Sequence, residues 1–186
     1  MLDDISSEHG YAAWGERLVA EGWTPYLLTF MFRPIGGSAA HIAEVMEAEV
    51  VRVYATFLPW VVRHPTRASS RGRHPIWFCA PDYPVHKRRK SSVRDVTIND
   101  GAHMHASAFQ PPASRFRDDL ANHFEANCEL YLRSDFALDR IDVEPITSNV
   151  GYVVRYGLKA IKNGRAGKDA TLILPRSLSE LRRING

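Results

Sequence analysis

The sequence has little cysteine: Cys79 and Cys128 are the only two, and they form no CxxC pair. Both lie inside apolar segments, far apart in the chain. The sequence therefore predicts neither a disulfide framework nor a zinc knuckle. Such sparse cysteine usage is typical of the reducing cytoplasm, where we expect this protein to work.

Long hydrophobic runs are also lacking, since no uninterrupted apolar stretch approaches the roughly 18 residues that span a bilayer. The N-terminal segment MLDDISSEHG is acidic and polar, without the basic-then-apolar order of a signal peptide. We therefore expect a soluble protein with no membrane partner. A GxxxxGK[ST] phosphate loop is absent as well, which excludes an evident helicase motor within this chain.

Charge is moderate in total but uneven along the chain. Of the 186 residues, 45% are hydrophobic and 24% are charged, and the formal net charge is +3 with a pI near 9.0. This composition predicts one globular domain, residues 1–186, with a substantial core. Basic residues gather between residues 63 and 94 and again between 155 and 168. The clustering indicates a polyanionic partner, although two solvated loops would give the same pattern.

Hydrophobic periodicity and chain breakers predict helices and strands in mixed order. The expected helices are 11–22, ended by Gly22; 39–62, capped by Ser38 and bent or ended near Pro59; 115–133, capped by Ser114; and 150–164. The expected strands are 24–35, 75–85, a strand pair within 93–109 and 139–146. This order favours an α+β fold with a central, largely antiparallel β-sheet flanked by helices.

Two histidines, in the tripeptide His103-Met104-His105, follow a turn signal at residues 99–101 in a segment of β character. Side chains alternate along a strand, so both imidazoles lie on one face, about 7 Å apart at the backbone. That spacing allows them to share one metal ion. By itself, an HxH pair is more often a surface or core feature than a metal site.

A second cluster lies on the last predicted helix, where Tyr152 and Tyr156 are four residues apart and Arg155 and Lys159 each follow a tyrosine by three. All four side chains can line one side of that helix. A cation beside a phenol favours the phenolate, whose unperturbed pKa is about 10, and can hold the phosphodiester that the phenolate attacks. Core packing with a solvated basic edge is the alternative interpretation.

Taken together and in this order, the motifs resemble those of HUH endonucleases, the family of rolling-circle replication initiators. The first motif of that family is a hydrophobic strand, here Leu27–Phe32; the second is His103-Met104-His105; the third is the tyrosine helix. The resemblance spans residues 24–163. It leaves 1–22 as an N-terminal helical region and 165–186 as a C-terminal extension.

The segment YVVRYGLK looks most like the two-tyrosine initiators of small phages, whose pattern is YxxKYxxK. Tyr156, whose YxxK is complete with Lys159, is the expected nucleophile, and Tyr152 is either a second nucleophile or a packing residue. Arg155 stands where the first lysine of the pattern lies, and its planar guanidinium differs from an ammonium in its geometry. The family also implies a third polar metal ligand before the histidines, for which Asp95 is the nearest match and Asp82 and Asp100 compete.

The resemblance implies a metal-dependent endonuclease that nicks and rejoins single-stranded DNA at a specific site, with Mg²⁺ or Mn²⁺ bound by His103 and His105. The product would be a 5′-phosphotyrosine intermediate that starts rolling-circle DNA replication or the transfer of a phage, plasmid or related mobile element. A separate helicase would then be a partner.

Basic side chains are expected to contact the DNA phosphates and make binding depend on salt. These residues are Arg71, Arg73, Lys87, Arg88, Arg89, Lys90 and Lys162. Trp77, Phe78 and Tyr83 would stack on bases if exposed. Trp77 and Phe78 are neighbours on a predicted strand and point to opposite faces, so at least one of them is expected in the core.

Two other classes of function remain open from the sequence. One is a nucleic-acid-binding module of the same fold that has lost turnover, which would bind DNA without a covalent adduct. The other is a metal-dependent hydrolase that uses water and does not need Tyr156; the sequence contains neither HExxH nor an HxHxDH-like extension in its support.

Overall fold

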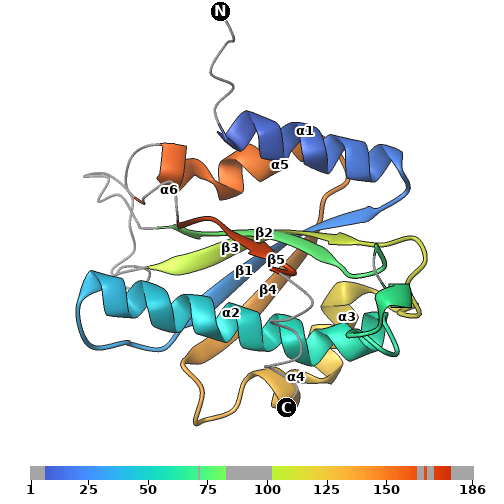
Figure 1. Ribbon diagram of the computed structural model, residues 1–186. Coiled ribbons are helices and arrows are strands. Elements are labelled where there is room, and N and C mark those ends of the chain that lie inside the picture. Colours follow the sequence, from blue (N-terminus) through green and yellow to red (C-terminus); the bar gives the residue numbers. More distant parts are fainter. Residues whose placement is uncertain (1–6, 71, 83–101, 163–165, 167–169, 177–186) are drawn as a thin grey trace, which may run out of the picture.

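The computed structural model describes residues 7–70, 72–82, 102–162, 166 and 170–176, and Figure 1 shows their arrangement. The helices are α1 (Ser7–Ala20), α2 (Ala39–Val61), the 3₁₀ turn η1 (Ala68–Ser70), α3 (Leu120–Ala126), α4 (Cys128–Tyr131), α5 (Val150–Gly157) and α6 (Lys159–Lys162). The strands are β1 (Thr24–Phe32), β2 (Ile76–Asp82), β3 (His103–Gln110), β4 (Leu138–Pro145) and β5 (Leu172–Leu174). Among these residues no helix is long and apolar enough to cross a membrane.

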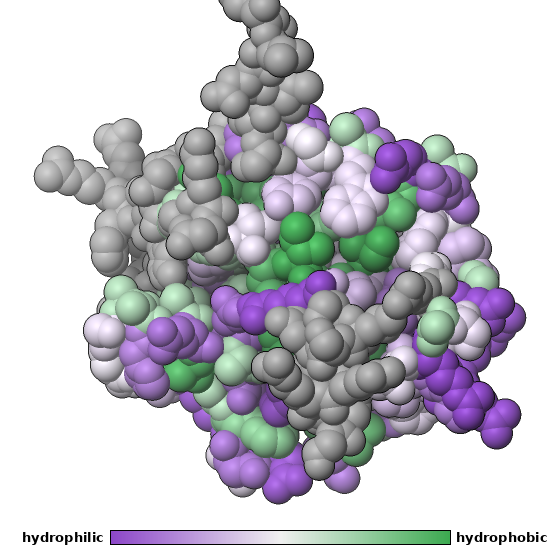
Figure 2. Space-filling model, viewed as in Figure 1, coloured by the Kyte–Doolittle hydropathy of each residue, from purple (hydrophilic) through white to green (hydrophobic). Residues whose placement is uncertain are grey.

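The five strands form one sheet in the order β4-β1-β3-β2-β5, and every pair of neighbours is antiparallel. Helices α1 and α5 lie on one face, and α2 with α3 and α4 lies on the other (Figure 1). The predicted α+β class with an antiparallel sheet between helices is therefore confirmed. In the space-filling view, apolar side chains show mainly between the two helical layers, and hydrophilic ones cover the outer sides (Figure 2).

Strand β2 is buried on both faces, which explains its continuous apolar run. Trp77 and Cys79 pack into the core beneath α2, whereas Phe78 and Ala80 pack into a second core beneath α1 and α5. The side chains of Trp77 and Phe78 are 0% and 2% exposed. The expectation that exposed aromatics of this strand stack on bases is thus wrong for both residues, because a central strand covered by helices on each face has no solvent side. Tyr83 lies outside the described residues.

Helix α2 begins as predicted, because the Ser38 hydroxyl accepts a hydrogen bond from the His41 N–H at the helix start. It continues past Pro59 and ends at Val61. A proline in the last turn removes only one intrahelical hydrogen bond, and the Val62 N–H still donates to the Leu58 carbonyl. The helix is therefore not ended by its proline.

The predicted helix 115–133 is shorter and is divided in two. Asp119, rather than Ser114, caps it, since its carboxylate accepts from the Ala121 and Asn122 N–H groups. The Ser114 hydroxyl instead accepts from the Phe116 N–H in a turn. The Arg115 N–H donates to the Val61 carbonyl, which ties this segment to the end of α2 and delays the helix until Leu120.

Strand β5 was not expected, because three residues in the C-terminal extension carry too little periodicity to be recognised. It pairs with Trp77 to Cys79 of β2. The turn expected at residues 99–101 and the strand before it lie outside the described residues. Strand β3 itself begins at His103 and stops at Gln110, just before Pro111 and Pro112, which cannot donate to the ladder.

Candidate metal centre and tyrosine nucleophile

The antiparallel pairing of β2 with β3 builds the centre. It places Asp82, the last residue of β2, opposite His103, the first residue of β3, and places Ala80 opposite His105. Paired residues point to the same face, so Asp82 and both histidines project toward α5 and α6. Asp82 is 4% exposed and His105 is 7% exposed, so both of these residues are buried.

The ligand atoms of Asp82, His103 and His105 all lie within 4.8 Å of one another. The two histidine Nε2 atoms are 3.1 Å apart, and the Asp82 Oδ2 lies 3.5 Å from that of His103 and 3.7 Å from that of His105. Two imidazole nitrogens and one carboxylate oxygen are a donor set that divalent transition metals and Mn²⁺ accept. These three residues fit such an ion.

Of the acidic residues considered as third ligand, Asp82 is the one that the structure brings to the histidines. Asp95, the first choice from the sequence, and Asp100 both lie outside the described residues. Sequence reasoning could not decide between them, because the contact depends on how β2 and β3 align across the intervening chain. The available signal was that Asp82 ends an apolar strand, where a polar side chain is unusual.

Lys159 forms the electrostatic link between this cluster and the tyrosine helix. Its Nζ lies 2.7 Å from the Asp82 Oδ2 and 4.0 Å from the centre of the Tyr156 ring. Burial alone would raise the pKa of Asp82, but hydrogen bonds from His105 and Lys159, with the charge of Lys159, hold it down to about 2. Burial would lower the pKa of Lys159, yet its contacts with Asp82 and Tyr156 raise it. Both groups are therefore charged at neutral pH.

The predicted helix 150–164 contains a break just before Lys159. Helix α5 ends at Gly157, Leu158 is its C-cap, and α6 begins at Lys159. A Cβ at Gly157 would stand 3.7 Å from the His105 Cβ, so α5 lies directly on the histidine strand at this point. Lys159 lies over the ring of Tyr156, three residues before it, and its Nζ also reaches Asp82.

Tyr156 is the tyrosine of α5 that lies beside the cluster. Its ring centre lies 5.9 Å from that of His105, and the ring is partly open to solvent, with 41% of the residue exposed. Tyr152 stands one turn before it, with the two rings stacked at 6.5 Å, and is 62% exposed. Neither tyrosine is a core residue, so the packing interpretation is wrong for both.

Arg155 does not join these residues. Its guanidinium lies beside Gly151, where α5 packs closely against Glu16 of α1. No contact of Arg155 with the cluster is found in the part of the chain that the structure describes. The prediction that all four residues of the YVVRYGLK segment line one side is thus wrong for Arg155, because the α1 contact draws its side chain away.

Thr29 is a residue that the sequence did not single out. It lies on β1 opposite His105, and its Oγ1 is 3.1 Å from the His105 Nδ1. A hydrogen bond at Nδ1 orients the ring and leaves Nε2 directed at Asp82 and His103. The signal in the sequence is a polar residue inside the hydrophobic strand LLTFMF.

The residues predicted to bind nucleic acid fall mostly outside the described part. Arg71 and the residues from Lys87 to Lys90 are not described, and of Lys162 only the backbone in α6 is. Arg73 is exposed and precedes β2, whereas Asp82 ends it. The seven residues of β2 span about 20 Å, so Arg73 cannot contact a phosphate held at the centre.

A scan of the chain against family models and searches of curated proteins and of solved structures found no match.

Proposed function

We propose that this chain cleaves and rejoins single-stranded DNA, with Tyr156 as the nucleophile and with Asp82, His103 and His105 holding a divalent cation. One observation carries the proposal: a partly exposed phenol, an ammonium and three convergent ligand atoms lie within a few ångströms of one another. A structural site would need no exposed tyrosine beside it. A hydrolase that activates water would need neither Tyr156 nor its cation.

The donor set is better suited to Mn²⁺ than to Mg²⁺, which usually prefers oxygen ligands. When bound, such an ion supplies Lewis acidity that polarises the scissile phosphate and offsets charge growing on its oxygens. His105 contributes through a ring that Thr29 holds in place, and Asp82 contributes a carboxylate that is ionised throughout the physiological pH range.

In the cleavage step, the Tyr156 oxygen forms a bond to phosphorus while the bond from phosphorus to the 3′ oxygen breaks. The phenol proton leaves to solvent, and the departing 3′ oxygen takes up a proton to become a free hydroxyl. Lys159, whose ammonium lies 4.0 Å from the tyrosine ring centre, can hold the negatively charged phosphate beside Tyr156. The other product is a 5′-phosphotyrosyl link.

Rejoining is the same chemistry in reverse. A free 3′ hydroxyl attacks the phosphotyrosyl phosphorus, its proton is released, and the bond to the Tyr156 oxygen breaks to restore the phenol. The link retains the energy of the original phosphodiester, so no nucleotide cofactor is needed. Tyr152, one turn away and more exposed, is placed to attack a second phosphate in such a transfer.

The test is incubation with Mn²⁺ and a labelled pool of single-stranded oligonucleotides with varied hairpins, followed by a denaturing gel and peptide mass analysis. We expect a covalent adduct on Tyr156 that is lost with a chelator, in His103→Ala and in Tyr156→Phe. Tyr152→Phe is the matched control and should retain a first adduct.

Two outcomes would contradict the proposal. Tight binding of the pool with no adduct would favour a binding module that lacks turnover. Cleavage that persists in Tyr156→Phe would favour a hydrolase that uses water. The denaturing gel distinguishes both outcomes from the expected adduct on Tyr156.

A further inference from the structure

The end of the sheet opposite the metal centre carries several arginines, with the acidic pair Asp118 and Asp119 directly after Arg117. Residues 60–81 contain no aspartate or glutamate, and the segment 108–117 contains none either. Figure 1 shows η1 and the C-terminal end of α2 on the side where β3 ends, away from where β3 begins at His103. Arg63, Arg67 and Arg115 are exposed there.

The loop that carries Arg63 and Arg67 is held in shape by its own hydrogen bonds. The Ser70 hydroxyl donates to the His64 carbonyl at 2.7 Å, and the Arg67 N–H donates to the same carbonyl at 3.1 Å. The His74 Nε2 lies 2.8 Å from the Pro65 carbonyl oxygen. A loop fixed in this way presents its arginines at defined positions, so less conformational entropy is lost when they bind.

Two separate segments bring their charges together at this place. The Arg115 N–H donates to the Val61 carbonyl, which sets the 111–117 segment beside the end of α2. The charge of Arg67, then burial, then the charges of Arg63 and Arg115 lower the pKa of His64. The hydrogen bond from Arg115 to Val61 thus joins the segment 111–117 to the chain that continues into Arg63.

An exposed aromatic residue borders these arginines. Trp60, in the last turn of α2, is 43% exposed although it is large and apolar. Its ring packs edge-on against His123 at 4.9 Å, and His123 is buried and lies 2.8 Å from the Tyr131 hydroxyl. The indole is thus supported from the protein side while part of it faces solvent.

We infer that Trp60, Arg63, Arg67 and Arg115 form a second contact for single-stranded nucleic acid, here called the Trp60 surface. Arginines bind phosphates through paired N–H groups, and an exposed indole offers a face on which any base can stack. Charge alone would suit any polyanion, but the combination with an aromatic is typical of single-strand binding. The inference deepens the proposed function and rests on it for the identity of the strand.

The Trp60 surface and the metal centre lie at opposite ends of β2, about 20 Å apart along the strand. One phosphodiester cannot occupy both. The Trp60 surface therefore holds a segment of the strand several nucleotides away from the cleaved bond, without reading its sequence, and makes affinity depend on oligonucleotide length.

The experiment measures binding of fluorescent dT₃₀ and dT₈ to the metal-free protein by anisotropy over a range of salt. The test variant is Arg63→Gln/Arg67→Gln/Arg115→Gln. The matched control, Arg17→Gln/Arg133→Gln/Arg176→Gln, removes the same charge at exposed sites elsewhere. Trp60→Leu removes the stacking face, and Trp60→Phe restores one. Thermal melts check that each variant is folded.

We expect the test variant to lower dT₃₀ affinity at least tenfold and to reduce the salt slope by about 2, since each phosphate contact on a single strand contributes about 0.7. Trp60→Leu should weaken dT₃₀ binding about tenfold, with recovery in Trp60→Phe. The preference of the wild-type protein for dT₃₀ over dT₈ should shrink in the test variant. Equal losses in test and control variants, or no loss in Trp60→Leu, would overturn the inference.

This experiment separates the inference from the proposed function. Loss of dT₃₀ binding in the variants, without any covalent adduct in the wild-type protein, would keep the Trp60 surface and reject the nuclease. An adduct on Tyr156 with unchanged dT₃₀ binding in all variants would keep the nuclease and reject the Trp60 surface.

Discussion

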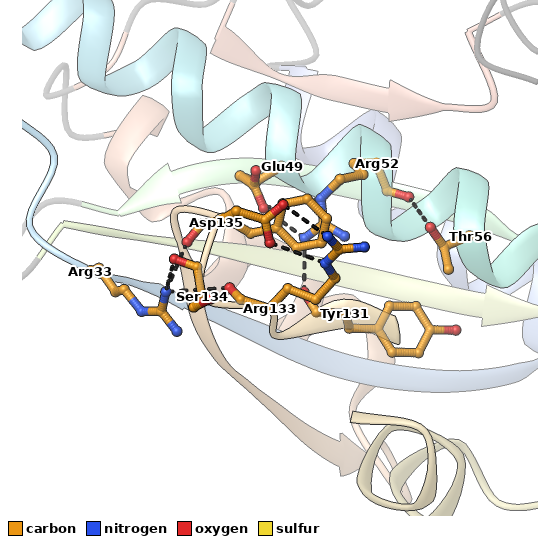
Figure 3. Close-up of polar contacts among 9 residues, drawn as sticks. Arg33, Glu49, Arg52, Thr56, Tyr131, Arg133, Ser134 and Asp135 are labelled. Atoms are coloured by element: carbon orange, nitrogen blue, oxygen red, sulfur yellow. Dashed lines mark hydrogen bonds and ion pairs between the residues drawn. The ribbon is translucent and has the colours of Figure 1, made fainter. Parts of the chain in front are cut away.

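Two clusters of charged side chains in this molecule differ in how their polar atoms are used. One is the metal centre. The other lies between α2 and the loop before β4, where Arg33 and Arg52 contact the segment 131–136, which includes Arg133 (Figure 3). We call the second one the arginine clip.

In the arginine clip, the cationic donors are met by acceptors of the same structure. Arg33 Nη1 donates to the carbonyls of Arg133, Ser134 and Phe136. Arg52 donates to Glu49 and to the Tyr131 carbonyl, and its guanidinium stacks 3.6 Å from the Phe136 ring centre. Such a cluster holds a loop in place, and its donors are already hydrogen-bonded to acceptors of the protein.

In the metal centre, by contrast, three ligand atoms converge on one another, and the Lys159 ammonium lies 2.7 Å from the carboxylate. Two imidazole nitrogens and a carboxylate oxygen, all of them atom types that bind metals, face one another at this place. Arginines whose donors end on backbone carbonyls hold a loop in place, whereas metal-binding atom types that converge on one point form a candidate binding site.

The largest effect that distinguishes the two clusters is on stability. We expect Arg52→Met to lower the free energy of unfolding by about 3 kcal/mol, because it removes a hydrogen bond, a stacked cation and the partner of the half-buried Glu49. Metal affinity should not change. Chemical denaturation measures the free energy of unfolding, and calorimetric titration with Mn²⁺ measures the metal affinity. Arg140→Gln, at an exposed ion pair, is the control and should cost less than about 0.5 kcal/mol. If Arg52→Met and Arg140→Gln lowered the free energy of unfolding equally, the arginine clip would be no more stabilising than an exposed ion pair.

A smaller effect is expected on the metal side. Thr29→Val keeps the shape of the side chain but removes the oxygen 3.1 Å from the His105 Nδ1. Loss of a partner that orients a histidine ligand typically weakens metal binding about 10- to 100-fold. Thr29→Ser keeps the hydroxyl and should restore affinity, as measured by the same titration. If serine behaved like valine, the hydroxyl would have no part in orienting the ring.

The smallest effect tests Lys159. In Lys159→Met the ammonium 2.7 Å from the Asp82 Oδ2 is lost, so an incoming divalent ion no longer competes with it. We expect Mn²⁺ affinity to rise about fivefold, equivalent to about 1 kcal/mol, while adduct formation falls. Lys159→Arg retains the charge and should leave Mn²⁺ affinity near that of the wild type. A fall in Mn²⁺ affinity in Lys159→Met would show that Lys159 supports the ion instead of competing with it.

Sequence patterns predicted what depends on neighbours along the chain. Alternation in β3 put both histidines on one face, and the four-residue spacing of Tyr152 and Tyr156 put the phenols one helical turn apart. Ser38 as a helix cap and Gly22 as a helix terminator were predicted from local chemistry, and Gly22 does adopt a positive φ of 88°. Each of these features is decided within a few residues.

Tertiary structure decided everything that joins distant segments. The register of β2 on β3 brings Asp82 to His103, the pairing of β1 with β3 brings Thr29 to His105, and the packing of α6 on β2 brings Lys159 to Asp82. Packing against α1 likewise removes Arg155 from the group. Register and packing follow from the burial of whole faces against one another, a collective property that no short sequence pattern encodes. The sequence alone therefore determined the two histidines and the tyrosines, and only the fold determined which residues surround them.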